Sequence, residues 1–284
     1  MGNEEKALTP SNPRVQRKKA HAALWYKEWR TQRWRFFLGT IVLSGLLAGM
    51  LRAQIIPNNE AALLIYWPVG VLMTIFLAMG PVASEKADRT WEFLVAQPVS
   101  RADALYVKWA VGVVQLIGMM AIATGCGILA MWSRGFSGQA TVFAFIEKGR
   151  WPEFNRIVVE WITGHPAAGL CLVAVPSVVA LACWYTPLFF ILTRARNEFA
   201  AALGGILLTI ALHAWLVQIW LAEPVEEHPI LAISALLNPL LTLVIAVTPG
   251  LPKWLLLGMP LYIVLWILVP LFLVRRFAER VGRS

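Results

Sequence analysis

The chain has 284 residues, of which 58% are hydrophobic and 14% are charged, and its formal net charge is +9. Soluble domains are roughly 45 to 50% apolar and about 25% charged, so this composition excludes an ordinary soluble domain. The apolar residues lie in runs of about 20, the length that crosses a hydrocarbon core. Because the basic residues lie beside these runs, membrane topology explains the charge better than nucleic-acid binding does.

The first 36 residues predict a cytoplasmic tail followed by an interfacial helix. Residues 1–19 are polar and basic, and we expect helical order to begin near Ala20. Four residues then follow i, i+4, i+7, i+11 spacing: Trp25, Trp29, Gln32 and Phe36. Tryptophans among cations are typical of an amphipathic helix in the headgroup layer. Four basic residues project away from this face: Lys27, Arg30, Arg33 and Arg35.

The apolar runs after this helix predict membrane spans. The bounds of the first five are 37–56, 62–82, 105–132, 167–192 and 199–221. The first two form a helical hairpin through the turn at residues 57–60. Two apolar stretches remain, at 230–247 and 254–274. The prolines of the spans predict kinked helices: Pro68, Pro81, Pro176, Pro187, Pro260 and Pro270.

The basic residues predict the orientation of the chain. Short cytoplasmic loops are rich in Lys and Arg, which places the N-terminus and residues 84–109 in the cytoplasm. The C-terminal arginines also lie in the cytoplasm if only one of the last two stretches crosses. We therefore expect 230–247 to be a re-entrant hairpin, broken at Asn238 and Pro239, before the last span. The expected fold is all-α and polytopic, with six spans in the inner (plasma) membrane.

The loop at 133–166 is expected outside the membrane, and it is too long to be a simple connector. Part of it carries apolar residues at i, i+3, i+4, i+7 spacing, which predicts an amphipathic helix on the outer surface: Phe154, Ile157, Val158 and Trp161. The membrane domain as a whole comprises residues 37–284.

Residues 84–109, between the second and third spans, form the most informative segment. Trp91, Leu94 and Val95 share one face at i, i+3, i+4 spacing, and the rest of the segment is charged. The spacing predicts a cytoplasmic helix over 85–97, which Pro98 ends. Ser100 is then expected to cap the next helix, together with Asp103 three residues later. A short charged helix held between two spans is suited to a mechanical contact.

This segment resembles the permease subunits of the ABC-2 family. Their pattern is similar to E-R-E-R-G-T-L-E-x-L-L-x-x-P-V-S-R, followed by a Lys, between the second and third of six spans. The chain departs from it at Ala87 and Asp88, and Arg89 stands where the family usually has Gly. The matching residues are Glu85, Thr90, Glu92, Leu94, Pro98, Val99, Ser100, Arg101 and Lys108.

The resemblance implies an exporter in which this helix couples the permease to a separate ABC ATPase. Two permease copies, expected as a homodimer in the lipid membrane, would dock onto two ATPase subunits, and ATP and Mg would bind there. The chain itself contains no GxxxxGK[ST] phosphate loop. The expected coupling residues are Glu85, Arg89, Thr90, Trp91, Glu92, Leu94, Pro98 and Arg101.

Polar residues within or near the spans are candidates for a substrate pathway. These are Arg52, Gln54, Gln115, His213 and Gln218. Arg52, Gln54 and Gln218 lie near the predicted outer ends of spans, where they either line an exit cavity or reach to headgroups. The substrate itself is not readable from these residues.

Two other functions compete with this interpretation. Ser137, within the string Gly135–Gly138, and His213 resemble the catalytic pair of rhomboid intramembrane proteases, but Ser137 lies in a polar outer loop. An ion-coupled carrier usually has acidic groups within its spans, and the centres of these spans contain no Asp or Glu. No metal site is predicted, because the four histidines are widely scattered.

Overall fold

The computed structural model describes residues 13–54, 58–87, 100–134, 164–193 and 197–222, and the single residues 268, 272 and 276. Every element within these ranges is helical, as the all-α prediction requires. The elements are α1 (Pro13–Ala53), α2 (Asn58–Leu64), the π-helix η1 (Ile65–Val69), α3 (Gly70–Ala87), α5 (Arg101–Trp132), α8 (Pro166–Leu192) and α9 (Glu198–Ala222).

Three of the described helices are long and apolar enough to cross a membrane, within Lys19–Ala53, Ala102–Trp132 and Pro166–Leu192. Ile65–Gly80 and Glu198–Ala211 are shorter apolar helices. These helices are those of a membrane protein. The predicted re-entrant segment 230–247 lies outside the described residues, as do most of the outer loop and most of the last predicted span. The count of six spans therefore stays a prediction.

Three of the described helices end close to where hydropathy places the span ends, whereas α3 runs on to Ala87, past the predicted span end at Val82 and into the predicted helix 85–97. The helix α5 ends at the predicted Trp132, α8 ends at the predicted Leu192, and α9 ends one residue after the predicted Leu221. The predicted cap of α5 is confirmed, because the Ser100 hydroxyl oxygen accepts a hydrogen bond of 3.0 Å from the Asp103 backbone N–H. This bond satisfies one of the free N–H groups at the start of the helix.

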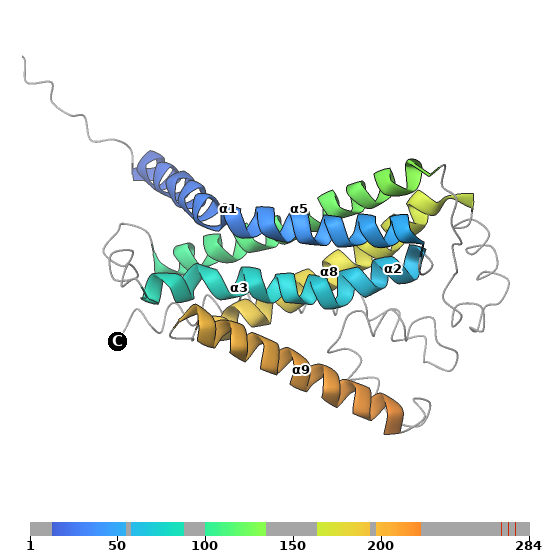
Figure 1. The fold of residues 1–284 in the computed structure, drawn as a ribbon. Helices are drawn as coiled ribbons and strands as arrows, with labels where there is room; N and C mark the ends of the chain where they lie inside the picture. The colour runs from blue at the N-terminus through green and yellow to red at the C-terminus, as the bar shows by residue number, and fades with distance from the viewer. Residues whose placement is uncertain are drawn as a thin grey trace, which may run out of the picture.

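Helix α1 differs from the prediction of two segments. It is one continuous helix that begins at Pro13, before the expected start near Ala20, and it bends along its length (Figure 1). Of the predicted interfacial face, Trp25 and Trp29 are each 38% exposed, whereas Gln32 is buried. The buried stripe repeats every three or four residues along the helix: Leu24, Glu28, Gln32, Arg35, Gly39, Leu43, Leu47 and Leu51.

Arg35 was expected to project away from the aromatic face with the other basic residues, and its burial was not foreseen. It is instead 5% exposed and lies on the face that packs against the bundle. Arg35 is buried because its position follows the same three- and four-residue spacing as the buried leucines in the apolar half of α1. Hydropathy alone treats every charge beside a span as solvated.

The π-helix η1 contains Pro68, one of the prolines where a kink was predicted, whereas α3 and α8 stay α-helical through Pro81, Pro176 and Pro187. Proline has no N–H to donate, and its ring collides with the carbonyl group of the preceding turn in a regular α-helix. A single π-turn relieves that collision by adding one residue to the turn. The backbone N–H of Gly70 accordingly donates to the Ile65 carbonyl, five residues earlier.

Helices α1 and α5 run parallel and side by side. Phe36 packs over Gly118, and the side chains of Leu47 and Leu51 pack over Gly127, so positions about 80 residues apart face each other along both helices. Figure 1 shows that the end of α3 and the starts of α5 and α9 lie at one end of the bundle. We call this the inner end, by the orientation expected from the basic residues.

Candidate functional site

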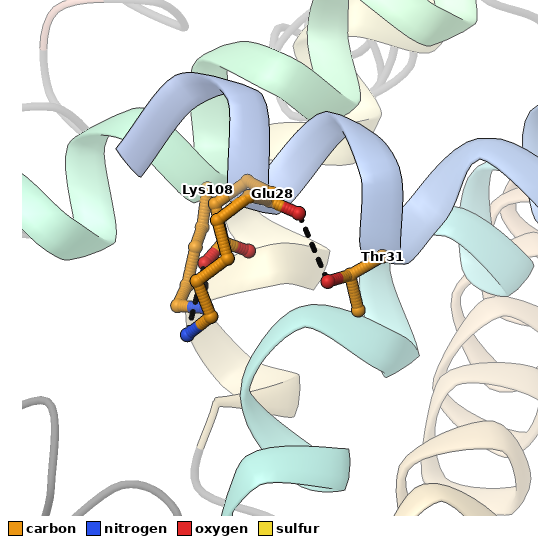
Figure 2. Close-up of polar contacts among 4 residues, drawn as sticks. Glu28, Thr31 and Lys108 are labelled. Atoms are coloured by element: carbon orange, nitrogen blue, oxygen red, sulfur yellow. Dashed lines mark hydrogen bonds and ion pairs between the residues drawn. The ribbon is translucent and has the colours of Figure 1, made fainter. Parts of the chain in front are cut away.

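A buried ion pair joins helix α1 to α5 near the inner end. The Lys108 ammonium of α5 donates a hydrogen bond of 2.7 Å to Glu28 Oε1 of α1. The two side chains are 0% and 2% exposed, and the side chain of Lys27 approaches the same carboxylate at 3.9 Å. Figure 2 shows Glu28 and Lys108 meeting between the two helices, with Thr31 further along α1. Since an unpaired buried charge is strongly unfavourable, each residue depends on the other.

A second ion pair joins α1 to α9. The Arg35 Nη2 atom donates a hydrogen bond of 2.6 Å to Glu198 Oε1. The side chain of Arg35 is 6% exposed, and that of Glu198, in the first turn of α9, is 38% exposed. The guanidinium also lies 5.7 Å from the ring centre of Phe76 of α3. It fits there because Gly80 has no side chain, and a Cβ atom at that position would overlap the guanidinium.

Three uncharged polar residues are buried near these pairs: Gln32, Gln115 and Tyr185. Gln115 lies seven residues after Lys108, on the same face of α5. The Tyr185 hydroxyl of α8 lies against Gly112 of α5, where a Cβ atom would overlap it. Polar and charged side chains from four helices therefore gather at the inner end. We call these seven residues the inner polar cluster: Glu28, Gln32, Arg35, Lys108, Gln115, Tyr185 and Glu198.

The length of α5 explains why this cluster tolerates charge. The helix has 32 residues, which corresponds to about 48 Å, whereas a hydrocarbon core of about 30 Å needs only about 20 residues. Trp132, at the other end, is 67% exposed, as suits an interfacial tryptophan. Counting about 20 residues back from Trp132 places the inner boundary of the core near Gly112. The Glu28–Lys108 pair then lies at headgroup level, and Gln115 lies just inside the core.

The structure does not bring all the predicted substrate-pathway residues together. Arg52 is exposed in the last turn of α1, and Gln54 ends that helix with a left-handed backbone (φ 51°). Gln115 lies level with Arg35 instead, about 25 Å along α1 from Arg52. His213 and Gln218 belong to α9, but the positions of their side chains lie outside the described part of the chain.

The predicted coupling residues are described only at the two ends of their segment. Glu85 lies in the last turn of α3 and Arg101 is the first residue of α5, although neither side chain is described. The remaining six lie outside the described residues: Arg89, Thr90, Trp91, Glu92, Leu94 and Pro98. Ser137 of the protease alternative lies outside them too. Within the described ranges, no group of His, Cys, Asp and Glu side chains is placed to hold a metal ion.

Sequence reasoning missed Glu28 and Glu198 as the partners of buried cations. Each is an isolated acid beside a long apolar run, which hydropathy treats as a solvated flank. The spacing of α1 could have predicted the burial of Glu28. The leucines that face the bundle repeat every three or four residues, and the same spacing, extended towards the N-terminus, reaches Glu28. No comparable signal pairs Glu198 with Arg35, since 163 residues separate them.

The fold and the cluster together define a class: an α-helical membrane protein in which the ion pairs Glu28–Lys108 and Arg35–Glu198 lie near one end of the bundle. A scan of protein-family models finds no match to the chain, and a search of curated proteins finds none either.

Proposed function

We propose that the chain is the permease subunit of an ATP-driven exporter, of the kind implied by the resemblance of residues 84–109 to the ABC-2 family. The observation that carries the proposal is the place of this segment. It connects α3 to α5 at the inner end, and Lys108, the last matching residue of the pattern, is buried against Glu28 of α1. A displacement of the segment would therefore reach two helices at once.

The described contacts supply a route for such a displacement. Ser100 caps α5, and α5 continues as one helix from Arg101 to Trp132. A push on its start would be carried along the helix and, through Lys108 and Glu28, to α1. The energy would come from an ATPase whose contact with the segment differs between nucleotide states. ATP and Mg would bind in that separate subunit.

The proposed assembly contains two copies of this chain and two ATPase subunits in the inner (plasma) membrane, with both termini in the cytoplasm. Arg52, Gln54, His213 and Gln218 remain candidates for contacts with the exported substrate. Gln115 suits that role less well, because it is fully buried among helices of one chain.

Co-expression with a candidate ABC ATPase subunit, followed by native mass spectrometry, tests the assembly. We expect a stable complex with two copies of each subunit. A chain that purifies alone and transports without any ATPase would contradict the proposal.

An ion-coupled carrier is a second candidate, and one observation favours it: Glu28 and Glu198 each form an ion pair with a buried cation. Both acids lie near the inner boundary of the hydrocarbon core and away from its centre, and this position favours the permease. Transport by proteoliposomes separates the two classes. An exporter requires internal ATP and tolerates a proton ionophore, whereas a carrier shows the opposite dependence.

A further inference from the structure

Four side chains of the inner polar cluster have hydrogen-bonding atoms that no described residue satisfies. These are both amide atoms of Gln32 and of Gln115, the Nε and Nη1 atoms of Arg35, and the Tyr185 hydroxyl. Gln32 is 2% exposed, Arg35 is 5% exposed, and Gln115 and Tyr185 are fully buried. Buried polar atoms nearly always have a partner, either in the protein or in ordered water.

Packing brings these atoms to one level of the bundle. The Tyr185 hydroxyl lies over Gly112, between Lys108 and Gln115 on the same face of α5. One turn of α5 away, Trp109 donates a hydrogen bond of 3.3 Å to the Thr186 hydroxyl and holds α8 alongside. Helices α5 and α8 are therefore in contact around Gly112.

Helix α1 meets the same level. Glu28 of α1 bonds Lys108 of α5, and further along the two parallel helices Met119 of α5 packs over Gly39 of α1. Gln32 lies between these two contacts on α1, so it faces the region of Gly112 on α5. Arg35 lies one turn further along α1, where its guanidinium packs against Gly80 of α3 and bonds Glu198 of α9.

The chemistry of these atoms identifies the missing partner. Both donors and acceptors are unsatisfied, so the partner must donate and accept hydrogen bonds. The nearby charges are already balanced, Lys108 by Glu28 and Arg35 by Glu198, and an added ion would bring an uncompensated charge into the bundle. Water meets both conditions, and a buried water typically makes about three hydrogen bonds.

We propose that Gln32, Gln115 and Tyr185 form a buried hydration site, which holds ordered water molecules between α1, α5 and α8. The site is independent of the exporter proposal, because it follows from the packing of this chain alone.

Radiolytic hydroxyl labelling of the full-length protein in lipid nanodiscs, read by mass spectrometry, tests the site directly. Radicals form from the water next to a side chain, so a buried residue is labelled only where water is bound. Tyr66 is the internal control: it is also 0% exposed, and its hydroxyl shares a hydrogen bond of 2.7 Å with Thr124. We expect Tyr185 to be modified several-fold faster than Tyr66. Equally slow labelling of the two tyrosines would overturn the proposal.

A matched pair of variants locates the water. Gln32→Leu combined with Gln115→Leu removes its partners and should lower the labelling of Tyr185 towards that of Tyr66. Met120→Leu, a substitution on α5 that removes no hydrogen-bonding atom, should leave Tyr185 labelling unchanged. Slow labelling of Tyr66 in each variant reports that it has folded. If Tyr185 is labelled equally fast in the folded double leucine variant, the hydration site is refuted, and the wild-type comparison stands even if a variant does not fold.

Discussion

At the scale of single residues, buried charge constrains this chain most strongly. Lys108 and Glu28 are almost completely removed from solvent, and their 2.7 Å contact is the main compensation for their lost hydration. Pairs of this kind add little net stability compared with an apolar pair, but removing one partner leaves the other charge buried alone. Single and double substitutions should therefore behave very differently.

The first prediction concerns this difference. Glu28→Gln or Lys108→Met alone should lower the free energy of unfolding by about 3 to 5 kcal/mol, because each takes the nearest opposite charge away from a buried charge. The double variant should lose much less than the sum. Thermal unfolding of the four proteins in detergent completes the double-mutant cycle. Additive losses would show that the two charges are not coupled.

The second prediction concerns the space beside Gly80, which the Arg35 guanidinium occupies. Gly80→Ala places a methyl group where the Arg35 guanidinium lies, so Arg35 must leave and its bond to Glu198 must break. Because Glu198 is partly exposed, we expect a loss of only about 1 to 2 kcal/mol in unfolding free energy.

Gly125→Ala is the matched control, because a Cβ atom there meets nothing within 4 Å. Alanine favours the helix over glycine by about 1 kcal/mol, so this variant should be neutral or more stable. Equal melting temperatures for Gly80→Ala and Gly125→Ala would show that Arg35 does not occupy the space beside Gly80.

At the scale of the elements, the start of α5 joins the predicted coupling segment to the bundle. Ser100→Ala removes the hydrogen bond to the Asp103 N–H and should cost about 1 kcal/mol. Amide hydrogen exchange at residues 101–104 should become faster, while Ser100→Asp, which keeps an accepting oxygen, should restore protection. If exchange is unchanged in Ser100→Ala, the cap does not stabilise this helix start.

Sequence patterns predict the helices better than the contacts between them. The ends of α5 and α8 could be placed closely because polar or helix-capping residues bound each apolar run. The burial of Arg35 could not be predicted, because it depends on which face of α1 packs against α5. The partner of Arg35 lies in α9, 163 residues away, and no local pattern carries that information. The ion pairs therefore emerge only once the helices are packed.

The same limit applies to the candidate site. The resemblance places a coupling segment at 84–109, and the structure adds that its last matching residue, Lys108, is buried against α1. Hydropathy grouped Gln115 with Arg52 and Gln54 because all three are polar residues in or near spans. Helix register separates them, because Gln115 lies level with Arg35 and the other two lie at the far end of α1.

At the scale of the whole molecule, the orientation of the chain is the fourth prediction. The N-terminus, residues 84–109 and the C-terminus should face the cytoplasm, as the distribution of Lys and Arg requires. In a background with its three cysteines replaced by alanine, Ser137→Cys should react with an impermeant thiol reagent in intact cells, whereas Ser284→Cys should react only after lysis. External labelling at residue 284 would contradict the six-span arrangement.

The central claim is that residues 85–97 transmit work from a separate ATPase, and Glu92 is the residue that tests it. Glu92→Lys keeps the surface charged but places like charge against any basic residue of the ATPase, and a lost interfacial pair typically costs about 2 to 5 kcal/mol. Ser137→Ala is the control, since it should disable a protease and leave a permease intact.

The most direct measurement is ATP hydrolysis and substrate export by the co-purified complex in proteoliposomes, for the wild type and both variants. The account predicts that Glu92→Lys inserts normally into the membrane but loses ATPase association or stimulation, while Ser137→Ala behaves as the wild type. An active Glu92→Lys protein beside an inactive Ser137→Ala protein would contradict it.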